Sequence, residues 1–227
     1  MNRFQAQPIW EISVYGYFPG VLDALDLHGA TVVDFSPLHD EALPPGTDIV
    51  YLGGGDPIAY ATQLAANHCL IAALRSHVCL GGRVYAEGGG LAYLCQSVRL
   101  PLPSSQTGAG QNLAMAGIFP AVAVYHRKVE IPQPVEVTLS RDHWLGPAGT
   151  LLRGYRDSAW RIEPFGQLAS YANHPSHASN PSRELDLVGR HRAIGSQLQL
   201  NFAAQGDFLQ RFLPLEVEGA RAVTLRF

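Results

Sequence analysis

The chain has 227 residues, of which 47% are hydrophobic and 15% charged, and its formal net charge at pH 7 is -3. These values fit an ordinary globular protein, which we predict to form a single domain over residues 1–227. Because no run of like charges occurs, we expect neither a nucleic-acid partner nor a membrane surface as partner. No secretory pattern opens the chain and no segment approaches the roughly 18 apolar residues of a membrane span, so we expect a cytoplasmic protein.

The cysteine content excludes two further classes. Cys69, Cys79 and Cys95 are odd in number and have no CxxC spacing. This argues against a disulfide framework and against a zinc site. We therefore expect buried, reduced thiols, no metal centre and no cofactor.

In chain order, the first part alternates short apolar runs with helical patterns. Strands are predicted at residues 9–15, 31–35, 49–52 and just before 85, and helices at 20–27, 59–77 and 91–98. Such alternation predicts an α/β fold in which helices cover both faces of a parallel sheet. Ligands of these folds bind at the carboxyl ends of the strands, where the glycine-rich turns 53–55 and 88–90 fall.

The later part of the chain has a different pattern. Segments rich in Ser, Gly, Gln, Asn, His or Pro at 102–114 and 170–183 predict surface loops. Short apolar runs at 121–125, 135–139 and 159–162 predict antiparallel strands. A further strand is predicted within 192–202, followed by a helix at 207–213.

The segment Tyr85-Ala86-Glu87-Gly88-Gly89-Gly90-Leu91 is the most informative stretch. A strand, a glycine turn and a helix form an elbow that lifts one side chain above the end of the sheet, next to backbone N–H donors. A catalytic elbow carries Ser or Cys at that position, whereas this chain carries Gly88. Because an elbow residue usually adopts a strained backbone conformation, glycine at this position would relieve strain.

This turn resembles that of the glutamine amidotransferase domain of the cobyrinate a,c-diamide synthase family, which reads Tyr-Ala-Glu-Cys-Gly-Gly-Leu. Other matching blocks are Phe35 to Asp40, Leu43 to Asp48, Tyr51 to Gly55, Leu145 to Thr150 and Leu200 to Ala203. The resemblance covers roughly residues 10–215 and implies a class I glutamine amidotransferase-like (flavodoxin-like) α/β fold with a parallel or mixed sheet. It does not extend to the ATP-binding half of the family's full-length members, so we expect no synthase domain.

In that family a Cys attacks the side-chain amide of glutamine and a His acts as general base. The family's final motif, Ala-Ser-Tyr-Val-His-Leu-His-Phe-Ala, matches residues 195–203 and places Gln199 in the slot of the base and Asn201 in that of the second His. Neither amide accepts a proton near neutral pH. In a competing alignment 169–171 begins the same motif and His174 would be a retained base; otherwise His174 and His177 are solvated loop histidines.

Other positions of the family's active site have also diverged. Residues 154–158 read Gly-Tyr-Arg-Asp-Ser in place of Gly-His-Glu-Phe-His, and 53–58 read Gly-Gly-Gly-Asp-Pro-Ile in place of Gly-Gly-Gly-Tyr-Pro-Glu. The backbone of Gly54 and Gly55 either forms an oxyanion hole with the N–H of Gly89 or serves only a tight turn. Cys95 follows the elbow by about two helical turns, roughly 10 Å, which is too far for a substitute nucleophile.

The remaining polar candidates have two interpretations each. Glu87 and Asp56 are candidates for the wall of the pocket. For Glu87 the alternative is that its hydrogen bonds fix the turn. The charged residues of the predicted sheet rim either line an anion-binding pocket or are solvated; they are Arg153, Arg156, Asp157 and Arg161.

Two classes of function follow. The first is a glutaminase-deficient, non-catalytic protein that binds a small molecule or a separate ATP-dependent ligase subunit and is linked to corrinoid or other tetrapyrrole amidation. The second is an enzyme that performs a different reaction in the former pocket with Glu87, Asp56, Asp157 or a loop histidine. The absence of a replacement nucleophile or metal cluster in the sequence favours the first class, although a pathway link inherited only through family membership is a third interpretation.

Overall fold

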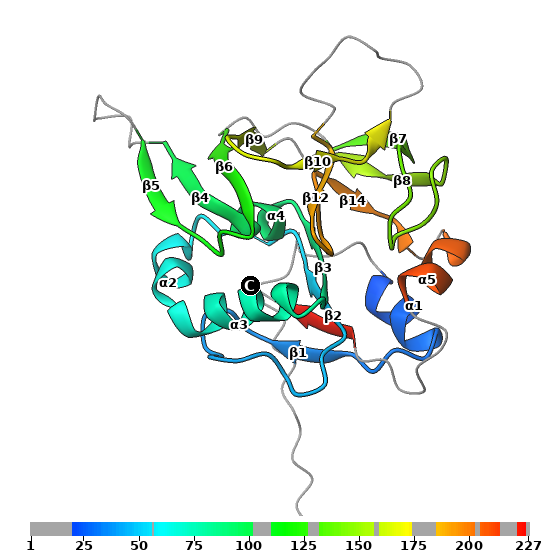
Figure 1. Ribbon diagram of the computed structural model, residues 1–227, viewed down its shortest axis with the longest axis horizontal. Helices are drawn as coiled ribbons and strands as arrows, with labels where there is room; N and C mark the ends of the chain where they lie inside the picture. Colours follow the sequence, from blue (N-terminus) through cyan, green and yellow to red (C-terminus); the bar gives the residue numbers. More distant parts are fainter. Residues whose placement is uncertain are drawn as a thin grey trace, which may run out of the picture.

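The computed structural model describes residues 20–55, 57–101, 110–126, 132–156, 159–173, 185–202, 205–213 and 222–225. Its largest sheet has seven strands in the order β1-β15-β2-β3-β13-β12-β10 (Figure 1). These strands are β1 (Val33–Phe35), β2 (Ile49–Leu52), β3 (Arg83–Glu87), β10 (Ala169–Ser170), β12 (Leu187–Arg190), β13 (Ala193–Ser196) and β15 (Ala222–Leu225).

The large sheet is parallel from β1 to β13 and antiparallel from β13 to β10. The parallel part is the one that the alternation of strands and helices predicts. The antiparallel part comes from the hairpin β12–β13, whose strands are separated by a turn at His191 with φ 56°. The sheet is therefore mixed.

Helices cover both faces of this sheet, as the sequence predicts. On one face α1 (Val21–Leu27) and α5 (Gly206–Phe212) share a hydrophobic core with Ile49, Tyr51 and Tyr85. On the other face a core forms between Val50, Val84 and three helices, which are α2 (Ala61–Ala66), α3 (His68–Cys79) and α4 (Gly89–Leu94). Successive residues of β2 and β3 thus alternate between two apolar layers, which explains why both strands are continuously buried.

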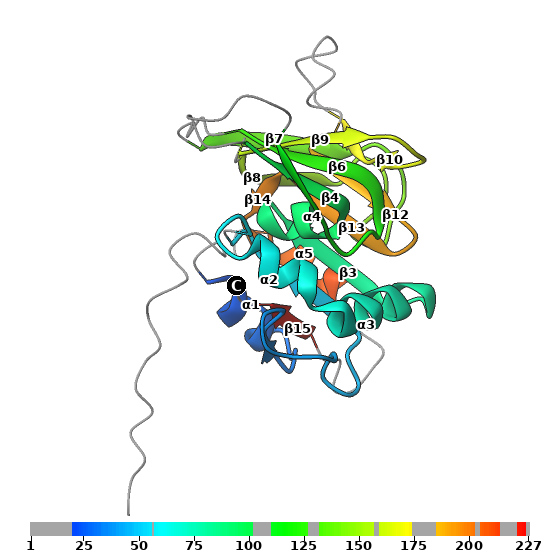
Figure 2. The ribbon, with the colours of Figure 1, turned by 90° about the vertical axis from the view of Figure 1, so that its left-hand side faces the viewer.

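Two four-stranded sheets lie next to each other at the end of the molecule opposite β1 (Figure 2). One has the order β5-β4-β6-β9, with β4 (Cys95–Leu100), β5 (Gln111–Ala114), β6 (Phe119–Tyr125) and β9 (Trp160–Pro164). The other has the order β11-β7-β8-β14, with β7 (Gln133–Leu139), β8 (Leu151–Arg156), β11 (Ala172–Asn173) and β14 (Leu198–Leu200). The expectation of antiparallel strands in this region is confirmed by the pairing of β6 with β9 and of β7 with β8, whereas β6 pairs with β4 in parallel.

Several sequence-based boundaries are wrong. The helix expected at 91–98 ends at Leu94, because Cys95 turns into extended backbone and begins β4. The helix expected at 59–77 is divided into α2 and α3 at Asn67, whose side chain accepts a hydrogen bond from the N–H of Leu70 and caps α3. A strand, β5, replaces the end of the loop expected at 102–114, and β10 and β11 occupy part of 170–183.

The remaining predicted elements lie near the two ends of the chain, and the structure describes those near the C-terminal end. The single strand predicted at 192–202 is divided into β13 and β14, which belong to different sheets, whereas the helix predicted at 207–213 is confirmed as α5. The strand predicted at 9–15 lies outside the described residues. Within the described residues, no helix is long and apolar enough to cross a bilayer.

Candidate functional site

The elbow predicted from the sequence is present between β3 and α4. Gly88 has φ 46° and ψ -105° and is the residue before the first turn of α4. Its N–H donates to the carbonyl of Ser196 at the end of β13, and its own carbonyl accepts from the N–H of Ala92. A positive φ of this kind is unfavourable for residues with a side chain. The backbone therefore retains an elbow conformation although no side chain is presented there.

A side chain at position 88 would nevertheless have space. A Cβ atom built on Gly88 would lie 3.6 Å from Cα of Gly54 and 3.9 Å from its carbonyl oxygen, which are ordinary contact distances. The obstacle to a larger residue is thus the backbone conformation and not steric overlap.

The start of α4 packs closely against the glycine turn at 53–55. The N–H of Gly90 donates to the carbonyl of Gly53 at 3.1 Å. A Cβ on Gly89 would overlap the carbonyl oxygen of Gly54 and lie 2.8 Å from that of Gly55. These glycines are required by the close approach of two backbones, and the carbonyl oxygens of the turn face Gly89. An oxyanion-hole role for the N–H groups of Gly54, Gly55 and Gly89 stays a prediction.

Glu87 is completely buried and is held by hydrogen bonds from three elements. The hydroxyl of Tyr51 on β2 donates to Oε2 at 3.0 Å, and the hydroxyl of Tyr85 on β3 donates to Oε1 at 2.9 Å. The N–H of Leu200 on β14 also donates to Oε1, at 2.9 Å. Of the two interpretations of Glu87, this arrangement supports the one in which the carboxyl fixes the turn.

Burial changes the acidity of this carboxyl. Removal from water raises the pKa of Glu87 from 4.5 to about 7, while the hydrogen bonds from Leu200, Tyr85 and Tyr51 act in the opposite direction. The surrounding side chains are aromatic, with the rings of Tyr51, Tyr85 and Phe202 packed against one another. A buried carboxyl whose oxygens are engaged by the protein is poorly placed to act on a ligand.

The motifs do not indicate that Tyr51 and Tyr85 are partners of Glu87, but the alternation of side chains along a strand does. Residues two apart on a strand point to the same face, so Tyr85 and Glu87 must share one face of β3. Tyr51 lies opposite Tyr85 in the parallel register of β2 and β3, which places its hydroxyl on that face as well.

The segment that carries Gln199 and Asn201 lies beside the elbow. β14 pairs with β8, with Gln199 opposite Tyr155 and Leu200 opposite Gly154. A Cβ on Gly154 would overlap the carbonyl oxygen of Gln199, so glycine at 154 permits the two strands to approach. The N–H of Asn201 donates to the carbonyl of Arg153, and its carbonyl accepts from the side-chain amide of Gln205. The roles assigned to Gln199 and Asn201 as former base slots stay predictions.

Cysteine chemistry at the elbow finds no support in the described residues. Cys95 is buried, its thiol donates to the carbonyl of Leu91, and burial raises the pKa of this thiol. Cys69 and Cys79 are free and exposed on α3, so the expectation that all three thiols are buried is wrong for these two. Both lie on the outer side of an amphipathic helix, whose buried residues are Leu70, Ile71, Leu74 and Val78.

Several other candidates are either outside the described residues or already paired. Asp56, Asp157, His174 and His177 fall outside the described ranges. Among the arginines of the proposed anion pocket, Arg153 binds Glu136, Arg156 forms an ion pair with the buried Asp186, and Arg161 binds Glu163. The structure therefore does not gather these arginines into one pocket.

No group of three or more His, Cys, Asp or Glu side chains within the described ranges has a spacing that could hold a metal ion. The site is thus an elbow whose turn residue has a positive φ, packed on a glycine turn and connected through Glu87 to β14. This order of strand, tight turn and helix is that of a nucleophile elbow, and the turn position is occupied by Gly88.

Comparison with known proteins agrees with this geometry. The model of the CobB/CobQ-like glutamine amidotransferase domain matches residues 10–156. The chain is 32% identical over 198 residues to cobyrinate a,c-diamide synthase of Caldanaerobacter subterraneus subsp. tengcongensis, covering 87% of this chain and 42% of that protein. It is 31% identical over 186 residues to hydrogenobyrinate a,c-diamide synthase of Streptomyces coelicolor, covering 82% of this chain and 35% of that protein.

The chain therefore spans about two fifths of the length of these relatives. A solved structure described as a glutamine amidotransferase superposes with a TM-score of 0.53 at 16% identity, covering 87% of this chain and 92% of that one. This likeness confirms the predicted class I glutamine amidotransferase-like α/β fold. The chain belongs to the family of CobB/CobQ-like glutamine amidotransferase domains.

Proposed function

We propose that this chain is a glutaminase-deficient member of its family, with a binding, regulatory or accessory role linked to corrinoid amidation. The observation that carries the proposal is the elbow, in which Gly88 keeps a backbone with φ 46° and ψ -105° and presents no nucleophile. Hydrolysis of glutamine by this route needs a thiolate or alkoxide at that position. The described thiol nearest in sequence, Cys95, is buried and bonded to Leu91.

The link to corrinoids comes from the relatives. Their names are cobyrinate a,c-diamide synthase and hydrogenobyrinate a,c-diamide synthase, that is, synthases of a,c-diamides of these two compounds. This chain corresponds to about two fifths of such a protein. The partner that we propose is a separate ATP-dependent ligase subunit, because the relatives are named for amide synthesis, with a small-molecule ligand as the other candidate.

The alternative, a different reaction in the former pocket, receives no support from Glu87. Although its pKa of about 7 would suit a general acid or base, the carboxyl is completely buried and accepts hydrogen bonds from Tyr51, Tyr85 and Leu200. A catalytic carboxyl must reach the proton that it transfers.

The test is release of ammonia from glutamine by the purified chain, alone and with a candidate ligase, together with calorimetry of glutamine binding. We expect neither turnover nor glutamine binding. Turnover that is lost in Cys95→Ala or His174→Ala would contradict the proposal and identify the residue responsible. As a positive control, the double variant Gly88→Cys with Gln199→His restores a thiol at the nucleophile position and an imidazole at the position of the base. It would show whether the scaffold supports ammonia release when both groups are present.

A further inference from the structure

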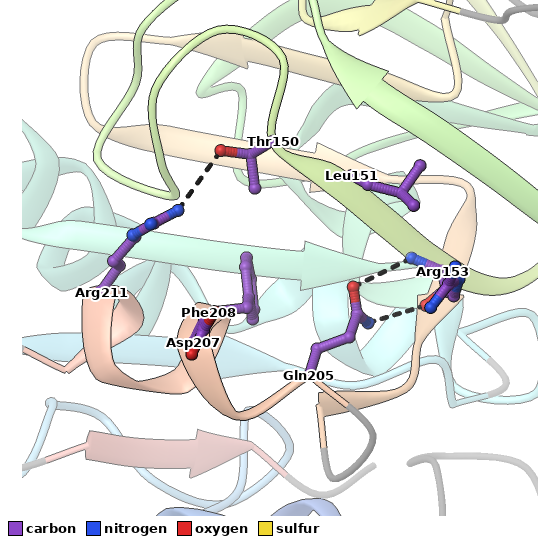
Figure 3. Close-up of a pocket in the computed structure, with 7 residues that line it drawn as sticks. All are labelled: Thr150, Leu151, Arg153, Gln205, Asp207, Phe208 and Arg211. Carbon is purple, nitrogen blue, oxygen red and sulfur yellow. Dashed lines mark hydrogen bonds between the residues drawn. The ribbon is translucent and has the colours of Figure 1, made fainter.

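A pocket lies between β8 and α5 (Figure 3). It has a volume of about 490 Å³ and is lined by Thr150, Leu151, Arg153, Gln205, Asp207, Phe208 and Arg211. None of these residues belongs to the elbow or to the glycine turn at 53–55. A ligand in this pocket would therefore be bound whether or not the chain hydrolyses glutamine.

The apolar part of the pocket is firmly supported. Phe208 is 3% exposed and stacks on Phe202, whose ring also packs against Tyr51 and Tyr85 in the core. Leu151 is 40% exposed and adds apolar surface to the wall of the pocket. In Figure 3, Leu151 and Phe208 lie between Arg211 on one side and Arg153 on the other.

The wall next to Arg153 is rigid because of Gln205. Its side-chain oxygen accepts from the N–H of Arg153 at 3.0 Å, and its side-chain nitrogen donates to the carbonyls of Arg153 and Asn201. The amide thus continues the hydrogen-bond ladder of β8 beyond the end of β14. Because both ends of this amide are engaged by the protein, Gln205 positions the wall and does not contact a ligand through these atoms.

Arg153 and Arg211 are the residues of the pocket whose guanidinium groups can donate hydrogen bonds to a ligand. Arg153 donates through Nε to Glu136 at 2.6 Å, and within the part of the chain that the structure describes its terminal guanidinium nitrogens have no such contact. Among the described residues, Arg211 donates to the hydroxyl of Thr150 alone, at 3.5 Å, and that hydroxyl donates to the carbonyl of Pro147. Guanidinium groups bind carboxylates through paired, charge-assisted hydrogen bonds.

From this arrangement we infer that the β8–α5 pocket binds a small dicarboxylate, with one carboxylate at Arg211, the other at Arg153, and an apolar spacer over Leu151 and Phe208. Asp207 lines the pocket and Glu136 is paired with Arg153, so both carboxylates repel a dianion, and removal of the Asp207 charge should strengthen its binding. The inference goes beyond the proposed loss of glutaminase activity because it assigns a ligand class to a different site.

The test uses adipate as the probe, measured by calorimetry with the full chain at low ionic strength, with hexanoate and 1,6-diaminohexane for comparison. We expect adipate to bind, hexanoate to bind about tenfold more weakly because one guanidinium contact is lost, and the diamine not to bind. Added salt should weaken adipate binding.

Variants separate the site from a general charge effect. Arg211→Ala and Arg153→Ala should each weaken adipate binding about tenfold, and Asp207→Asn should strengthen it. Arg161→Ala is the matched control, since Arg161 has a similarly exposed side chain and lies outside the pocket. The inference is wrong if adipate does not bind, if adipate and hexanoate bind equally, or if Arg161→Ala weakens binding as much as the pocket variants do.

Discussion

The carboxyl oxygen Oε1 of Glu87 accepts a hydrogen bond from the N–H of Leu200 at 2.9 Å. Glu87 directly precedes the elbow residue, and Leu200 directly follows Gln199 on β14. One buried contact between residues 113 positions apart in the chain thus fixes the relative position of the two segments that form the candidate site. Glu87 therefore contributes to the scaffold of the candidate site through this contact.

The first prediction concerns the pH dependence of stability. In the unfolded chain the Glu87 carboxyl has a pKa near 4.5, and in the folded chain about 7. Between these values the folded state holds a proton that the unfolded state lacks, so this group's contribution to stability falls as pH rises from about 4.5 to about 7 and is constant above. In Glu87→Gln this dependence is absent. Relative to the unaltered chain, the variant should gain up to about 3 kcal/mol in free energy of unfolding between pH 5 and pH 8.

Urea unfolding of both proteins at the two pH values measures this change. Tyr51→Phe serves as the matched control. It removes one hydrogen-bond donor to the carboxylate and should raise the pKa of Glu87 further, so the fall in stability should continue to a higher pH than in the unaltered chain. If the difference in free energy of unfolding between Glu87→Gln and the unaltered chain is the same at pH 5 and pH 8, the pKa of Glu87 is not raised by folding and the prediction is wrong.

The second prediction concerns Gly88. Cysteine or alanine at this position would adopt φ 46°, so Gly88→Cys and Gly88→Ala should each lose about 1–3 kcal/mol of stability. Because a Cβ has space 3.6 Å from Cα of Gly54, both variants should fold. Thermal unfolding with an assay of ammonia release checks this expectation; Gly88→Cys alone should release none. A variant that is more stable than the unaltered chain would contradict the strained conformation at residue 88.

The third prediction concerns the packing of α4 on the glycine turn. Gly89→Ala would force a methyl group into the carbonyl oxygens of Gly54 and Gly55 and should cost more than about 2 kcal/mol. Gly81→Ala is the control: Gly81 has φ 88° and open space around its Cβ position, so only backbone strain of about 1 kcal/mol applies. Equal losses in the two variants, measured by urea unfolding, would mean that the close approach is not maintained in solution.

The fourth prediction concerns thiol reactivity. In the folded chain Cys69 and Cys79 should react with an aromatic disulfide reagent, while Cys95 should react only after denaturation. The reasons are the burial of Cys95 and the raised pKa of its thiol. Counting labelled thiols by mass spectrometry before and after denaturation checks this. Rapid modification of Cys95 in the folded chain would contradict this prediction and show that its thiol is accessible enough to act as a nucleophile.

The sequence by itself determined the α/β class, the strand-turn-helix elbow at residues 85–91 and the helices on both faces of the sheet. These features depend on local patterns, namely runs of buried residues, alternation with helical spacing, and glycines at turns that need a positive φ. The glycine at position 88, where the resembling family motif has a cysteine, is likewise read directly from the sequence.

Only the tertiary structure decided where segments distant in the chain meet. Cys95 leaves α4 for a strand because β4 pairs with β5 and β6 on its two sides, a contact that no local pattern shows. Glu87 is fixed by donors from two other strands as well as its own, and the pocket joins Arg153 of β8 with Arg211 of α5. Such contacts depend on how the strands and helices pack, and local sequence patterns do not encode that packing.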